Sequence, residues 1–122
     1  MREVFSRWNE GERDFDDAVF EEALTIHSAL TGDVYEGIDG LRAWAAEIDD
    51  QFKDWNLVVD DVEPLTDDRV LARGEIRMTG RQSDVAIAQP ASWVIDLVEG
   101  RIATIRNFMG RKAASEFARE MP

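Results

Sequence analysis

Asp96 is the residue whose type and position most clearly point to chemistry, because it lies within a strand-like segment. The stretch SWVIDLVEGRIATIRNF, residues 92–108, is typical of two β-strands joined by a turn at Glu99-Gly100. Strands disfavour Asp, and a buried carboxylate is costly unless it is paired, hydrogen-bonded or neutralised. Two roles fit Asp96: a polar anchor inside an apolar pocket, or a solvated carboxylate near a hairpin end.

A two-residue turn at Glu99-Gly100 predicts which hairpin residues share a face. It places Asp96 opposite Ala103, and the residues predicted on the same face are Val94, Ile105, Asn107 and Met109. Apolar side chains mixed with a few polar groups are expected of a ligand pocket. The other face is more apolar, so we expect a second copy of the chain to cover it: Trp93, Ile95, Leu97, Ile102 and Phe108.

Composition narrows the classes of partner and cofactor. The chain has 122 residues, a net charge of −12, one His and no Cys. An acidic chain repels phosphate backbones, so we expect no nucleic acid partner. A zinc site would need several carboxylates beside His27, so we expect no metal and no cofactor. No apolar run approaches the roughly 18 residues of a membrane span and no secretory signal is visible, so we expect a cytoplasmic protein without a membrane partner.

The elements that must position these residues follow from periodicity. One apolar stripe at helical spacing predicts a long helix: Leu41, Trp44, Ala45, Ile48 and Phe52. Shorter helices are predicted at Arg2–Asn9, Asp14–Phe20 and Lys112–Arg119, and a short strand at Leu24–Ser28. Four further strand-like segments follow Trp55: residues 56–65, 69–78, 84–98 and 101–109. Pro90 predicts a bulge or an edge position in the third of them.

Helices followed by an antiparallel meander predict an α+β fold. We expect a single domain over residues 1–122, in which a curved, cone-shaped antiparallel sheet of about four long strands wraps on the long helix. Such an arrangement leaves room for a pocket between the sheet and the helix.

The stretch VYEGIDGLRAWAAEIDDQF, residues 34–52, resembles the segment of SnoaL-like proteins, in the nuclear transport factor 2-like superfamily, where a Tyr-x-Gly-x-x-Gly pattern introduces the long helix. The resemblance extends through RWNEGERDFDDAVFEEALTIHS and WVIDLVEGRIATIRNFMGRKAA, and so covers nearly the whole chain. That superfamily includes polyketide cyclases, ketosteroid isomerases, limonene-epoxide hydrolases and non-enzymatic members. The resemblance therefore implies a fold without fixing a function.

The resemblance also implies roles for individual residues. Asp96 matches the Asp that helps to form the oxyanion hole of ketosteroid isomerases, whereas Ser28 falls where those enzymes keep an Asp base. The Arg73-x-Glu75 segment is similar to the Arg-x-Asp of the epoxide hydrolases, and Asn107 falls at their last-strand Asp. Neither Ser nor Asn can replace a carboxylate base at neutral pH. Arg73 and Glu75 equally fit a solvated polar stripe.

Two hypotheses follow. The first is an enzyme of the cyclase, isomerase or epoxide-hydrolase type acting on a small hydrophobic molecule; the second is a non-catalytic, dimeric ligand-binding or accessory domain. The catalytic candidates are Asp96, Asn107, Glu75 and Arg73. The candidates for lining the ligand pocket are Trp8, Ile26, Ser28, Trp44, Val94, Ile105 and Met109. The expected partners are a small apolar molecule and a second copy of the chain.

Overall fold

The computed structural model describes residues 20–81, 85–110 and 112–120. The helix predicted at Arg2–Asn9 lies outside these ranges, as does Trp8. Most of the helix predicted at Asp14–Phe20 lies outside them too, but Phe20 itself begins a strand.

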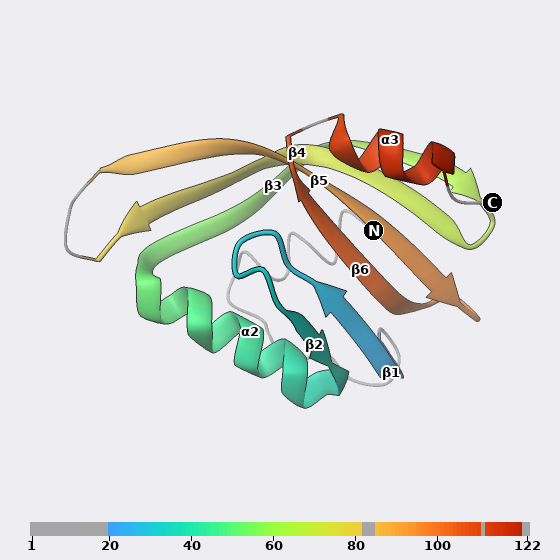
Figure 1. Ribbon diagram of the computed structural model, residues 1–122, viewed down its shortest axis with the longest axis horizontal. Coiled ribbons are helices and arrows are strands. Elements are labelled where there is room, and N and C mark those ends of the chain that lie inside the picture. The colour runs from blue at the N-terminus through green and yellow to red at the C-terminus, as the bar shows by residue number, and fades with distance from the viewer. Residues whose placement is uncertain (1–19, 82–84, 111, 121–122) are drawn as a thin grey trace.

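Within the described ranges, six strands form one curved, open sheet in the order β2-β1-β6-β5-β4-β3 (Figure 1). The strands are β1 (Phe20–His27), β2 (Val34–Glu36), β3 (Phe52–Thr66), β4 (Arg69–Gly80), β5 (Ala86–Val98) and β6 (Arg101–Met109). Neighbouring strands are antiparallel except for β1 and β6, which are parallel. The helices are α2 (Gly37–Gln51) and α3 (Ala113–Glu120). The α+β prediction with four long strands is confirmed, and two shorter strands extend the sheet.

Helix α2 presents one apolar stripe to the sheet, as its sequence period predicts. Leu41, Trp44, Ala45 and Ile48 are all buried, while Phe52 belongs to the following strand. Asp39 in the first turn places a negative charge near the positive end of the helix dipole. Among the described residues, no helix is long and apolar enough to cross a membrane.

The two helices define two faces of the sheet, which lies between them in Figure 1. The inner face packs on α2 and holds most of the buried apolar side chains: Leu24, Ile26, Leu57, Ala72, Ile76, Met78, Trp93 and Ile95. The outer face packs on α3 through a smaller cluster: Leu71, Val94 and Phe108 with Ala114 and Phe117 of the helix. Every side chain in the sheet therefore belongs to one of two distinct environments.

A bulge in β6 decides which hairpin residues share a face. Val98 pairs with Arg101 and Leu97 with Ile102, as a two-residue turn requires, but the register then shifts and Asp96 pairs with Thr104. Ala103 is the extra residue. Because strand side chains alternate, one extra residue exchanges the faces of everything beyond it.

Two predictions are wrong for this reason. Asp96 and Val94 do not share a face with Ile105, Asn107 and Met109, because they pair with Thr104 and Arg106 on the outer face. The apolar face assigned to a second copy is not an exposed surface either. Trp93, Ile95 and Ile102 are buried in the core with α2, and Leu97 packs against them. Phe108, assigned to the same face, lies on the outer face beside Phe117.

The sheet bends where β3, β4 and β5 cross its middle. A Cβ on Gly74 would lie only 1.8 Å from the carbonyl oxygen of Val58, so the two backbones approach more closely than any side chain allows. The β3 register shifts next to this contact, between Val59 and Asp61. Beyond it the β4–β5 end of the sheet projects away from the rest of the molecule (Figure 1).

Pro90 marks the point where β5 becomes an edge strand. The last residue of β5 paired with β6 is Ala91, opposite Met109, and the Gly110 amide donates to the Pro90 carbonyl at 2.7 Å. Residues 86–90 pair with β4 alone. The edge position predicted from the proline is confirmed, since Pro cannot donate to a second neighbour.

Candidate functional site

The predicted site residues divide between the two faces. Ile26, Ser28, Trp44, Ile105, Asn107 and Met109 lie on the inner face or on the helix that packs against it. Asp96, Val94, Arg73 and Glu75 lie on the outer face. Three of the four catalytic candidates therefore point away from α2. Of the predicted site residues that the structure describes, Ser28 and Asn107 place a hydroxyl and an amide on the inner face.

Ser28 is the polar centre of the inner face. It follows the end of β1, and only 7% of its surface is exposed. Its Oγ accepts hydrogen bonds from Trp44 Nε1 at 3.0 Å and from the Thr31 amide at 3.3 Å. A hydroxyl has two acceptor lone pairs and one hydrogen to donate. Both lone pairs are used, and the hydrogen has no acceptor among the described residues.

The turn after β1 is held by a second group of polar side chains. The Tyr35 hydroxyl donates to a Glu47 carboxylate oxygen on α2 and lies 2.8 Å from Thr31 Oγ1. Burial raises the pKa of Tyr35, and its bond to Glu47 raises it further. The Gly32 amide donates to the Ser28 carbonyl at 3.0 Å. Together these contacts fix the conformation of the turn that carries Ser28.

Three residues of this group do not follow from the expected site: Tyr35, Thr31 and Glu47. Tyr35 does carry a sequence signal, because it opens the Tyr-x-Gly-x-x-Gly pattern, but that pattern predicts the entry to a helix and not a polar contact. Glu47 lies three residues after Trp44, on the exposed side of the helix. Spacing alone does not show that it reaches across to Tyr35.

Asn107 has a structural role, because its side-chain amide is hydrogen-bonded to the backbone. Its Oδ1 accepts from the Ala29 amide at 3.2 Å, and its Nδ2 donates to the carbonyls of Ser92 and Phe108 at 3.3 and 3.4 Å. The side-chain amide has therefore used both of its N–H groups on the backbone. Its effect is to tie β6 to the turn that carries Ser28.

Asp96 is the centre of an ion-pair cluster on the outer face. Arg69 Nε donates to Asp96 Oδ1 at 2.6 Å, and Arg106 Nη1 donates to Oδ2 at 3.1 Å. The Asp96 side chain is 23% exposed. His27 lies beside Arg106 in the parallel pairing, and burial, followed by the charge of Arg106, lowers the pKa of His27. A strand accepts this carboxylate because two arginines satisfy it.

Arg73 and Glu75 are engaged on the outer face as well. Arg73 donates to Asp61, to Glu63 at 3.1 Å and to Ser115 of α3 at 3.3 Å. Glu75 accepts from Arg77 Nε at 2.6 Å. Arg73 therefore joins α3 to the edge strand β3, on the side of the sheet opposite Ser28.

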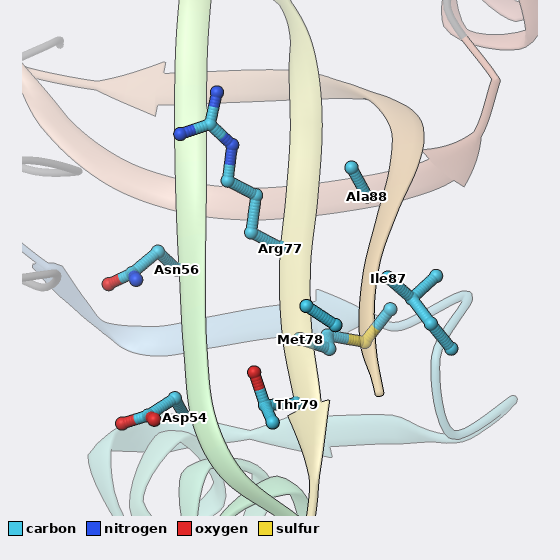
Figure 2. Close-up of a pocket in the computed structure, with 8 residues that line it drawn as sticks. Asp54, Asn56, Arg77, Met78, Thr79, Ile87 and Ala88 are labelled. Carbon is cyan, nitrogen blue, oxygen red and sulfur yellow. The ribbon is translucent and has the colours of Figure 1, made fainter. Parts of the chain in front are cut away.

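A shallow pocket of about 200 Å³ lies on the outer face, at the projecting β4–β5 end (Figure 2). Its lining residues come from three neighbouring strands: Asp54, Asn56, Arg77, Met78, Thr79, Ala86, Ile87 and Ala88. None of the residues predicted for the site is among them. The pocket and Ser28 are thus on different faces of the sheet.

Comparison with known proteins agrees with this architecture. An NTF2-like protein of unknown function from Burkholderia pseudomallei superposes with a TM-score of 0.79 at 16% identity, covering 97% of this chain and 91% of that one. The enzyme SalBIII, described as epoxide hydrolase/cyclase-like and involved in pyran ring formation in the polyether salinomycin, gives 0.75 at 25% identity over 89% and 86%. TerC, co-crystallised with polyporic acid, gives 0.77 at 11% identity over 95% and 92%.

No curated protein matches the chain by sequence. The SnoaL-like domain family model matches residues 1–105, which is most of the chain. The resemblance to SnoaL-like proteins stated from the sequence is confirmed, and the chain belongs to the SnoaL-like domain family.

Proposed function

We propose that the protein binds a small, mainly apolar molecule at the inner face and that the Ser28 hydroxyl donates a hydrogen bond to an oxygen of that molecule. The observation that carries this proposal is the hydroxyl hydrogen of Ser28, which has no acceptor within residues 20–81, 85–110 and 112–120. A buried donor without an acceptor is costly, so a ligand oxygen placed there gains a full hydrogen bond.

The surroundings of Ser28 make it a strong donor. Its oxygen accepts from both the Trp44 indole and the Thr31 amide, which polarises the remaining O–H bond. The neighbouring inner-face side chains are apolar: Ile26, Ile105 and Met109. An apolar wall with one convergent polar group is the usual composition of a small-molecule site. Relatives support this class of ligand, since TerC was crystallised with polyporic acid.

Binding without turnover is the form of the proposal that the polar groups support best. Proton abstraction needs a base, and a Ser hydroxyl does not serve as one at neutral pH without a partner. Asp96 pairs with arginines on the outer face, and Asn107 uses its amide on the backbone. A ligand-binding or accessory role therefore requires nothing beyond the groups already described.

The likeness to SalBIII favours a second candidate, a cyclase or epoxide-hydrolase type of reaction. There the Ser28 hydroxyl would donate to the epoxide or carbonyl oxygen as negative charge develops on it. The same residue would be used in both cases. The two candidates differ in whether product forms.

A matched pair of probes tests the binding proposal. 2-Acetylnaphthalene and 2-ethylnaphthalene have similar apolar surfaces, but only the ketone carries an acceptor oxygen. We expect the wild-type protein to bind the ketone about fivefold more tightly, corresponding to about 1 kcal/mol for one hydrogen bond, in calorimetric titrations. Ser28→Ala should equalise the two affinities.

Asp96→Asn is the matched control, because it changes a polar group of the outer face and should leave both affinities unchanged. Circular dichroism checks that each variant is folded. Equal wild-type affinities for the two probes, or no binding of either, would overturn the proposal. For the second candidate, we would incubate the protein with limonene oxide and analyse the products by gas chromatography; diol or cyclised product that disappears in Ser28→Ala would establish catalysis.

A further inference from the structure

Protein donors occupy both acceptor positions of Ser28 Oγ, and this limits which ligands Ser28 can bind. Trp44 Nε1 donates to the oxygen at 3.0 Å, and the Thr31 amide donates to it at 3.3 Å. A hydroxyl oxygen has two lone pairs, so neither is left for a third donor. Ser28 can therefore donate a hydrogen bond to a ligand, but it cannot accept one from it.

The first of these donors, the Trp44 indole, is held in place by packing. Trp44 lies in the middle of α2 with only 9% of its surface exposed, and its ring meets Trp55 edge-on at a centroid distance of 5.5 Å. Turning the ring away from Ser28 would break the hydrogen bond in a buried setting, where lost bonds are costly. The indole N–H therefore does not yield its position to a ligand.

The second donor, the Thr31 amide, is held in place by the turn after β1. The Tyr35 hydroxyl gives its single hydrogen to the Glu47 carboxylate, so its oxygen is left to accept from the Thr31 hydroxyl, 2.8 Å away. Thr31 Oγ1 in turn accepts from the Asp33 amide at 3.3 Å. Because the Thr31 side chain is anchored at two points, its backbone N–H stays directed at Ser28.

We propose that the inner-face site selects apolar ligands whose polar group only accepts hydrogen bonds, such as ketones and ethers, and rejects ligands of the same shape that present an N–H group there. This inference rests on the proposed function, because it requires the ligand to lie at Ser28. An N–H group directed at Ser28 would meet the hydrogens of Ser28, Trp44 and Thr31 and no lone pair. A buried donor left without an acceptor weakens binding, so the site discriminates by hydrogen-bond direction.

Three bicyclic probes of nearly one shape test this selection. Indene, 1-indanone and indole carry a CH₂, a C=O and an N–H group at the same ring position. We expect the wild-type protein to bind 1-indanone about fivefold more tightly than indene, and indole about fivefold more weakly than indene, in equilibrium dialysis. The first difference measures the bond that Ser28 donates, and the second measures the absence of a lone pair for the indole N–H.

Trp44→Phe gives the sharpest test, because it removes one donor and frees a lone pair on Ser28. Indole can then donate to Ser28, so its affinity relative to indene should rise about fivefold over the wild-type ratio. If Trp44 served packing alone, the change would weaken both probes alike and leave the ratio unchanged. Trp55→Phe is the matched control, since the Trp55 indole N–H donates to Asp49 at 2.6 Å and not to Ser28. Its ratio should equal that of the wild-type protein.

A second pair of variants acts on the other donor and decides the question if Trp44→Phe does not fold. Thr31→Val has nearly the same shape as Thr31 but loses the hydroxyl that anchors the turn, so the indole-to-indene ratio should rise. Thr31→Ser keeps the hydroxyl and should retain the wild-type ratio. Circular dichroism checks that each variant is folded.

The outcomes separate this inference from the proposed function. If the wild-type protein prefers 1-indanone but binds indole as tightly as indene, the proposed function stands and the selection against N–H groups is overturned. An unchanged ratio in folded Trp44→Phe, or in Thr31→Val where Trp44→Phe is unfolded, also overturns the inference. If the wild-type protein binds none of the probes, or does not prefer the ketone, the proposed function and this inference are both wrong.

Discussion

Trp44 Nε1 donates to Ser28 Oγ at 3.0 Å, and this bond joins the middle of α2 to the end of β1. The same indole meets Trp55 of β3 edge-on, with ring centroids 5.5 Å apart. Trp44 thus connects the helix to the two strands that lie at opposite ends of the described sheet order, β1 near one edge and β3 at the other.

Removing the Trp44 side chain should therefore cost a large fraction of the protein's stability. We expect Trp44→Ala to lower the free energy of unfolding by about 3–5 kcal/mol, because a large buried side chain leaves a cavity. Trp44→Phe retains an aromatic ring and loses the indole N–H, and should cost about 1–2 kcal/mol less than the Ala variant. Urea unfolding monitored by circular dichroism measures both. A loss below about 1 kcal/mol for Trp44→Ala would contradict this account of the core.

Asp96→Ala tests whether the outer cluster is structural. The change leaves Arg69 and Arg106 without their shared carboxylate in a partly buried setting, so we expect a loss of about 2 kcal/mol in the free energy of unfolding. Arg77→Ala removes a more exposed ion pair and should change stability by less than about 0.5 kcal/mol. Because Asp96 faces away from Ser28, naphthyl ketone binding should persist in the folded variant. If Asp96→Ala lost ketone binding without losing stability, Asp96 would have to be a ligand-binding residue.

The β5–β6 hairpin shows which structural features can be predicted from the sequence and which cannot. The apolar stripe of α2, the four long strands and the turn at Glu99-Gly100 each follow from a local pattern repeated over many residues. The bulge at Ala103 does not, since no Gly or Pro marks it and Ala is compatible with an ordinary strand position. This one bulge residue places Asp96 on the face of the sheet opposite to the one predicted.

The position of Ser28 was predicted, but its chemistry was not. Its place at the end of β1 follows from strand alternation, with Ile26 on the same face. Its two donors come from α2 and from the turn, and neither can be assigned before the packing of helix on sheet is known. Arg69 was missed as the partner of Asp96 for the same reason, since the pair is 27 residues apart in sequence.

Adding a single methyl group at Gly74 should disrupt the packing of the β4 backbone against β3. A Cβ there would clash with the Val58 carbonyl, and the obstacle is backbone rather than a movable side chain. We expect Gly74→Ala to cost about 3 kcal/mol or to prevent folding, as overpacking against a fixed group does. Gly32→Ala is the control: it meets no atom within 4 Å and incurs only the penalty of a positive φ, about 1 kcal/mol. Equal losses for the two variants in urea unfolding would show that β3 can move aside.

His27 should make the protein less stable as the pH falls below neutrality. Burial and the neighbouring Arg106 lower its pKa from the usual 6.5, so the folded state prefers the neutral imidazole. Between the lowered pKa and 6.5 the unfolded chain binds more protons than the folded one, and stability therefore rises with pH across that window and is lost as the pH drops through it. Carboxylates also titrate in acid, so the comparison is with His27→Gln, which keeps a polar side chain and does not titrate. We expect the wild-type minus variant difference in unfolding free energy to grow as the pH rises from about 5 to 7 and to be flat above that range. A difference that stays constant with pH, measured by urea unfolding in matched buffers, would show that His27 is equally easy to protonate in the folded and unfolded states.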